Sequence, residues 1–411
     1  MDFIIRNARL AGAPELRVDI GIANGRIAAI EPGLAACAEQ LDVGGKLVAP
    51  GLVETHLHLD KACILDRCRA DSGSVDEAIS EVARAKASFT PEDVYQRARR
   101  TLEQCIAHGS THVRTHLEVD PGIGLRGLEG VLPLVEEYRW AVDLEICIFP
   151  QEGLLNNPGT EALMLEAMKR GGKVLGACPY TDSDPHAQID RIFELARELD
   201  VDIDMHLDFD LVADDVNLIH LCRRTQEFGH GGRVTAGHVT RLSALEPTAF
   251  AHAARQLADS GVALTILPST DLYLMGRQRE HDVVRGVTPA HRLLPHGVNC
   301  SLATNNVLNP FTPFGDCSLV RMANLYANTC HVGARGDMAQ CFQMITTRAA
   351  RLMNLADYGL AVGKPADFVV LDCNSVEAAV AELAQVLYAF KAGRRTLTRE
   401  PARLHRPARG E

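Results

Sequence analysis

The two ends of the chain show short runs in which apolar and polar positions alternate. Near the N-terminus these runs predict strands at 3–10, 18–22 and 26–30, and Asn24-Gly25 predicts a tight hairpin turn because both residues tolerate positive φ. Residues 366–372 and 386–390 have the same character. We therefore expect the two ends to contribute strands to one small β unit.

Between the ends, apolar runs typical of strands alternate with helical stretches. The expected strands are 52–60, 112–120, 142–150, 174–180, 201–209, 233–239, 262–270 and 299–307. The expected helices include 91–108, 160–170, 189–199, 211–228, 242–260 and 289–295. Eight such alternations predict an α/β fold, a closed (β/α)₈ barrel of the TIM type, with a doubly wound open sheet as the alternative. In a barrel, catalytic groups lie at the C-terminal ends of the strands.

Four histidines stand at the ends of three of these expected strands. His56 and His58 follow one another at i and i+2, so both imidazoles point to the same side of a strand and can bind one metal ion. His206 and His238 end the fifth and sixth strands. A single histidine on an apolar strand is more often a hydrogen-bonded core residue, but four at one end of a barrel favour a metal site. Such a site suits zinc or iron and activates water for attack on an amide or amidine carbon.

Composition narrows the classes of partner. The chain has 411 residues, of which 46% are hydrophobic and 23% charged, as in ordinary globular proteins. A formal net charge of -11 argues against nucleic acid as a partner, and the only basic cluster, Arg399, Arg403, Arg406 and Arg409, is expected to be a solvated end. With no signal segment and no long apolar run, we expect a cytoplasmic protein that does not enter a membrane. Twelve scattered cysteines predict no disulfide framework.

Several motifs together resemble the amidohydrolase superfamily, and within it the branch of cytosine deaminase and N-isopropylammelide amidohydrolase. The order of the four histidines is similar, and the motifs that carry the resemblance are His112-Val113-Arg114-Thr115-His116, Phe149-Pro150-Gln151-Glu152-Gly153, Leu272-Tyr273-Leu274-Met275-Gly276-Arg277, Pro313-Phe314-Gly315 and Gly363-Lys364-Pro365-Ala366-Asp367. The resemblance implies a catalytic barrel at 51–355 and a small β-sandwich made from 1–50 and 356–411. It also implies one divalent metal ion, zinc first, with iron or manganese as alternatives.

The resemblance assigns roles to individual residues. It implies that His56, His58 and His206 bind the metal and that His238 touches the attacking water or the polarised substrate atom. Gln151 matches the residue that reads the amide edge of a pyrimidine in cytosine deaminase. Lys61 matches a substrate-site lysine of the ammelide hydrolase, or else forms a structural ion pair with a nearby carboxylate.

Two positions depart from the family pattern. The family places an aspartate after strand eight, where it binds the metal and takes a proton, but this chain has Asn305. An amide oxygen can coordinate a metal ion but cannot serve as a base near neutral pH. After His206, the chain reads Asp208-Phe209 where cytosine deaminase has Asp-Glu, so Asp208 is a candidate acid and base and Phe209 adds an apolar wall to the substrate site.

We therefore expect a metal-dependent hydrolase of C–N bonds that acts on a small nitrogen heterocycle or a cyclic amide or amidine, and not on cytosine itself. The alternative is a ligand-binding or lyase barrel that has lost hydrolysis together with the family carboxylates. A small molecule is the expected partner, and a homo-oligomer is compatible with the family.

Overall fold

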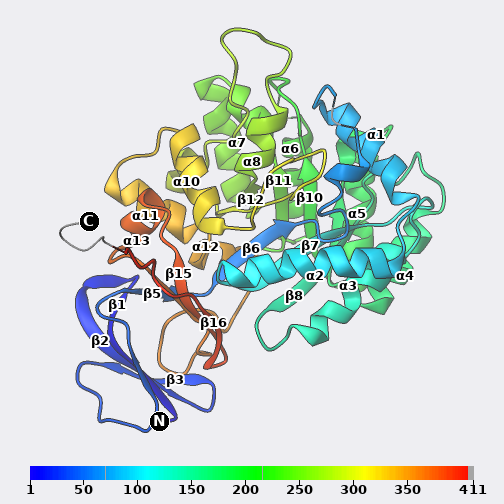
Figure 1. Ribbon diagram of the computed structural model, residues 1–411. Helices are drawn as coiled ribbons and strands as arrows, with labels where there is room; N and C mark the ends of the chain where they lie inside the picture. Colours follow the sequence, from blue (N-terminus) through cyan, green and yellow to red (C-terminus); the bar gives the residue numbers. More distant parts are fainter. Residues whose placement is uncertain (70, 215, 406–411) are drawn as a thin grey trace, which may run out of the picture.

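The computed structural model describes residues 1–69, 71–214 and 216–405, so Arg406 and Arg409 of the basic end lie outside the described residues. Its larger part is a nearly closed barrel of eight parallel strands (Figure 1). In barrel order these are β6 (Leu52–Leu57), β7 (Ser110–Glu118), β8 (Asp143–Phe149), β9 (Val174–Ala177), β10 (Asp202–Leu207), β11 (Val234–His238), β12 (Ala263–Ile266) and β13 (Cys300–Leu302). The predicted α/β barrel is confirmed at this level.

The last strand approaches the first at the C-terminal end of the barrel. Asn305, just beyond β13, donates its backbone N–H to the carbonyl of His56 at 2.8 Å and accepts from the N–H of His58 at 3.0 Å. A chain of hydroxyl groups also crosses this seam, because Ser301 Oγ lies 2.9 Å from Thr55 Oγ1 and 3.0 Å from Thr265 Oγ1. These bonds place residue 305 between the two histidines of the first strand.

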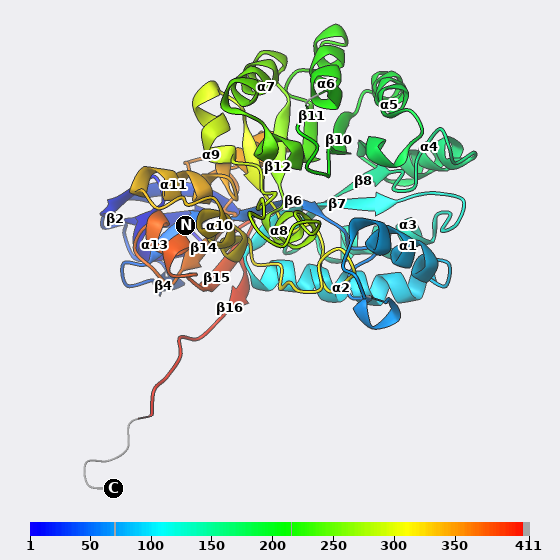
Figure 2. The same ribbon diagram turned by 90° about the horizontal axis from the view of Figure 1, so that it is seen from above.

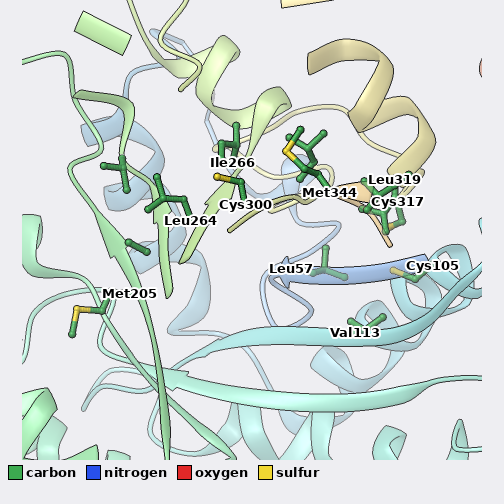
Figure 3. Packing of buried hydrophobic residues seen from close by; sticks show 14 of the residues in the cluster. Leu57, Cys105, Val113, Met205, Leu264, Ile266, Cys300, Cys317, Leu319 and Met344 are labelled. Atoms are coloured by element: carbon green, nitrogen blue, oxygen red, sulfur yellow. The ribbon is translucent and has the colours of Figure 1, made fainter. Parts of the chain in front are cut away.

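Helices connect the barrel strands and pack around them (Figure 2). They are α1 (Val75–Lys86), α2 (Pro91–Ala107), α3 (Arg126–Glu137), α4 (Thr160–Arg170), α5 (Pro185–Leu199), α6 (Val216–Glu227), α7 (Pro247–Ser260), α8 (Pro268–Leu274), α9 (Ala290–Leu293), α10 (Leu319–Thr329), α11 (Arg335–Gln343) and α12 (Thr347–Leu352). In α2, Val94, Ala98, Leu102 and Cys105 recur at helical spacing and are buried. Figure 3 shows how Leu57, Val113 and other apolar side chains from strands and helices fill this core.

Both chain ends contribute to one second sheet. Its order is β16 (Arg394–Thr398), β15 (Val386–Lys391), β14 (Phe368–Leu371), β5 (Leu47–Pro50), β1 (Phe3–Leu10), β2 (Ala13–Ala23) and β3 (Arg26–Glu31), and β4 (Gln40–Asp42) also pairs with β1. In the chain, α13 (Val376–Ala381) connects β14 to β15. The sheet has its own buried cluster, which includes Ile5, Ile20 and Phe368. The pairing confirms a joint β unit, whereas a two-layered sandwich stays a prediction.

The second sheet attaches at the N-terminal ends of the barrel strands. Lys391 Nζ of β15 lies 2.7 Å from Asp143 Oδ2, at the first residue of β8. Tyr358, in the segment that leads to β14, donates to the carbonyl of Gly51, just before β6. The opposite end of the barrel, where the four histidines stand, is therefore clear of this sheet.

Several expected strands are shorter than predicted, among them β9, β12 and β13. β9 and β12 end before Pro179 and Pro268, which open a 3₁₀ helix and α8, because proline cannot donate to a strand ladder but fits the first turn of a helix. β13 ends at Leu302, so Asn305 lies in the segment that follows the strand. Within the described ranges, no helix combines the length and the apolar character needed to cross a membrane.

Candidate active site

Three histidines converge at the C-terminal end of the barrel. The Nε2 atom of His206, on β10, lies 3.1 Å from Nε2 of His56 and 3.1 Å from Nε2 of His58. His56 lies in β6, and His58 is the first residue after that strand. The i, i+2 spacing therefore brings both rings to one point. All three side chains are buried. Their ligand atoms form a group that can hold one metal ion.

The chemistry of this group fits a divalent metal. Burial is the main cause that lowers the pKa of His56, His58 and His206 well below 6.5, so the rings are neutral and their nitrogen lone pairs are available. His58 Nδ1 lies 3.0 Å from the backbone carbonyl of His116 and donates to it, which leaves Nε2 as the lone-pair nitrogen. Two nitrogens 3.1 Å apart can both lie about 2.1 Å from one ion, the usual distance between zinc and a histidine nitrogen.

Asn305 lies beside this group, as its place in the sequence predicts. Its backbone joins His56 and His58, its side chain is buried, and its Oδ1 has no hydrogen-bond partner among the described residues. A buried carbonyl oxygen without a partner needs one. Its φ of 64° is left-handed, a conformation that asparagine and aspartate tolerate better than other residues with a Cβ.

His238 lies next to the histidine group and is held by two neighbours. Its Nδ1 lies 2.6 Å from Oδ1 of Asp271, a fully buried carboxylate in the first turn of α8. The ring of Phe209 packs on the ring of His238 with centroids 3.9 Å apart. Phe209 therefore covers part of His238 with an apolar ring, and its place in the wall of a substrate site stays a prediction. Burial raises the pKa of Asp271, and the neighbouring His238 opposes that rise.

Asp208 is buried at the end of β10. Its Oδ1 accepts from Nδ2 of Asn217 at 2.8 Å, and its Oδ2 has no partner among the described residues. Burial raises its pKa to about 6. Asp208 thus keeps one carboxylate oxygen with unused acceptor capacity, and its role as acid and base stays a prediction.

Lys61 and Gln151 meet at the edge of the site. Lys61 Nζ lies 3.0 Å from Gln151 Oε1 and 2.7 Å from Glu118 Oε1. Lys86, from α1, binds the other oxygen of Glu118 at 3.1 Å and Asp120 at 2.6 Å. Lys61 is therefore in a buried ion pair, as one of the two alternatives predicts, and it also donates to Gln151; its role in substrate binding stays a prediction.

Sequence reasoning missed several buried polar residues around the histidines. His116 stacks on His56 with ring centroids 3.7 Å apart, and its Nε2 lies 3.4 Å from Asp204 Oδ1. Arg114 binds the other oxygen of Asp204 at 2.8 Å. His116 and Arg114 are part of a motif that carried the family resemblance, and Asp204 precedes His206 by two positions on the same strand; that same-face spacing was the signal available.

A parallel barrel with histidines converging at its C-terminal end defines a hydrolase of the metal-dependent class. The chain belongs to the Amidohydrolase family, whose model matches residues 39–132 and 138–397. This confirms the predicted superfamily and enzyme class, hydrolysis of C–N bonds.

Named relatives extend over nearly the whole chain. N-isopropylammelide isopropyl amidohydrolase of Pseudomonas sp. (strain ADP) is 29% identical and is covered over 96% of each chain. Pterin deaminase of Rhizobium rhizogenes is 28% identical over 86% of this chain and 82% of its own. The crystal structure of 5-methylcytosine deaminase from Klebsiella pneumoniae liganded with 5-fluorocytosine is 30% identical, with a TM-score of 0.94 over 98% of this chain and 99% of that chain.

Proposed function

We propose that this enzyme hydrolyses a C–N bond of a small nitrogen heterocycle or cyclic amide. One divalent ion, with zinc as the first candidate, is held by His56, His58, His206 and Asn305. The observation that carries the proposal is the convergence of three buried Nε2 atoms, with that of His206 lying 3.1 Å from those of both His56 and His58. Such an ion lowers the pKa of water and polarises the bond under attack. We assign this activity to residues 51–355, flanked by a β-sandwich of 1–50 and 356–411.

The remaining residues bind and orient the substrate. Gln151 and Lys61 each keep an N–H donor at one edge of the site, because Gln151 Nε2 uses one of its two hydrogens on Cys178 Sγ and Lys61 uses two of its three on Glu118 and Gln151. Phe209 forms an apolar wall against His238. Asp208 and His238 are the groups proposed to move protons, because Asn305 cannot do so.

The relatives support a heterocyclic substrate. Their names concern an ammelide, a pterin and 5-methylcytosine, all of them nitrogen heterocycles. Phe209 stands where cytosine deaminase has a glutamate, so the wall beside His238 is apolar and disfavours the binding of cytosine itself. We therefore propose an aminated or N-alkylated heterocycle, with ammonia or an amine as the leaving group.

The test combines metal content with turnover. The purified protein is analysed for zinc, iron and manganese, then assayed for ammonia and amine release over pyrimidines, triazines, pterins and cyclic amides. We expect about one ion per chain and release from at least one compound, and His58→Ala should lose both. Full metal loading with binding of a compound but no release would instead support the non-hydrolytic alternative.

A further inference from the structure

We propose that Asp271 is the carboxylate that replaces the one missing at position 305, and that it acts through His238, which serves as the general base. The inference rests on the proposed hydrolytic function and adds a positioning residue to it. It concerns a contact between the end of β11 and the first turn of α8, made by two residues that are 33 positions apart in the chain.

The geometry fixes which nitrogen of His238 carries the proton. Asp271 Oδ1 lies 2.6 Å from Nδ1, and the other carboxylate oxygen accepts from the backbone N–H of Leu267 at 3.2 Å. An ionised carboxylate only accepts hydrogen bonds, so Nδ1 must donate. In the neutral ring Nε2 then carries the lone pair, which is the form a base requires.

The position of the ring suits it to act on a water molecule at the histidine group. Its centroid lies 5.7 Å from that of His206 and 6.1 Å from that of His56. Phe209 packs on one face of the ring and restricts its rotation. The backbone is held as well, because Thr288 Oγ1 donates to the carbonyl of Val239 at 2.7 Å, next to two successive residues with positive φ, His238 at 68° and Val239 at 48°.

Other buried carboxylates near the histidines make their contacts with groups other than His238. Glu54 accepts from the backbone N–H groups of Thr304 and His56. Asp208 accepts from Asn217 of α6 through Oδ1, and the same oxygen lies 3.7 Å from the guanidinium of Arg241, which follows β11. Among the described residues, Asp271 is the carboxylate that contacts the His238 ring.

In the proposed reaction, His238 both accepts the proton of water and returns it to the leaving group. One O–H bond of water breaks, its proton passes to Nε2, and the oxygen forms a bond to the substrate carbon. As the C–N bond breaks, Nε2 returns that proton to the departing nitrogen. Asp271 stays ionised and stabilises the imidazolium between the two transfers, so it binds no proton itself.

The experiment compares Asp271→Asn with a matched control. An asparagine at 271 offers an N–H to Nδ1 and favours the opposite tautomer, with the proton on Nε2. The control is Asp190→Asn, because Asp190 Oδ1 makes a similar contact with His220 Nε2, at 2.7 Å, between α5 and α6. ¹⁵N NMR of zinc-loaded, histidine-labelled protein reads the tautomer, with the His238 signal assigned by its loss in His238→Gln.

We expect the Nδ1–H form in the wild type, the Nε2–H form in Asp271→Asn, and a fall in kcat on the order of 10²–10⁴-fold with KM little changed. Asp190→Asn should keep wild-type kcat. An Nε2–H tautomer in the wild type, or a folded Asp271→Asn variant with wild-type kcat, overturns the proposal. The wild-type spectrum decides even if the variant does not fold, and a wild type without turnover contradicts the proposed function but not the tautomer.

Discussion

The ammonium group of Lys61 lies 2.7 Å from a carboxylate oxygen of Glu118, and both side chains are about 2% exposed. Removing one partner of a buried ion pair leaves the other charge without compensation, which commonly costs several kcal/mol. Lys86 also pairs with Glu118, so it reduces the free-energy cost of losing Lys61.

Lys61→Met should therefore lower the free energy of unfolding by about 3 kcal/mol, measured by urea denaturation of the zinc-loaded protein. The matched control is Lys46→Met, because Lys46 pairs with Asp372 at the surface, where each side chain is 40% exposed. A surface pair contributes below about 1 kcal/mol. Equal losses in the two variants would show that the Lys61 pair does not stabilise the fold.

Glu118 should make stability depend on acid pH. Burial by itself raises its pKa, but the charges of Lys61 and Lys86 outweigh burial and hold the pKa at about 2, below the ordinary 4.5. The ionised form thus stabilises the fold above pH 4.5, and that contribution is lost as the pH falls from 4.5 toward 2. At about 1.4 kcal/mol per pH unit, it amounts to at most about 3 kcal/mol.

The measurement compares wild type with Glu118→Gln in urea between pH 7 and pH 3. The wild type should be more stable at pH 7, and the difference should shrink as the solution is acidified. Acid release of metal is common to both proteins and cancels in the comparison. A difference that stays constant with pH would contradict the assignment.

Gly237 should be required for the position of His56. A Cβ atom at Gly237 would lie 3.1 Å from Cε1 and 3.2 Å from Nδ1 of the His56 ring, so alanine must displace that ring. We expect Gly237→Ala to weaken zinc binding by about 10–100-fold, the range found when the support of a metal ligand is disturbed. Competition with a chromophoric chelator measures it. Gly12→Ala is the control, since nothing lies within 4 Å of its Cβ, and an equal loss there would refute the explanation.

Asn305→Asp should tighten zinc binding. Aspartate tolerates the left-handed backbone at this position as asparagine does, and its charged oxygen is a stronger ligand than an amide oxygen. We expect at least ~10-fold higher affinity in the same chelator competition. Asn328→Asp, exposed near the end of α10, adds the same charge elsewhere and should change nothing. Unchanged affinity in Asn305→Asp would place residue 305 outside the ligand set.

The sequence by itself determined the order of the barrel strands and the end at which the histidines gather. That information is local, because apolar runs mark buried strands and the i, i+2 spacing of His56 and His58 fixes a shared side. The same local reasoning overextended several strands, among them β9, β12 and β13, and did not name α1 and α3, whose helical periodicity was present in the chain.

Only the tertiary structure decided which polar groups meet. His238 and Asp271 are 33 residues apart, Lys61 and Glu118 are 57 apart, and Lys61 and Gln151 are 90 apart. Such contacts depend on strand register and barrel closure, which bring the C-terminal ends of distant strands together. A local pattern shows that a side chain is buried, but not which partner compensates its charge.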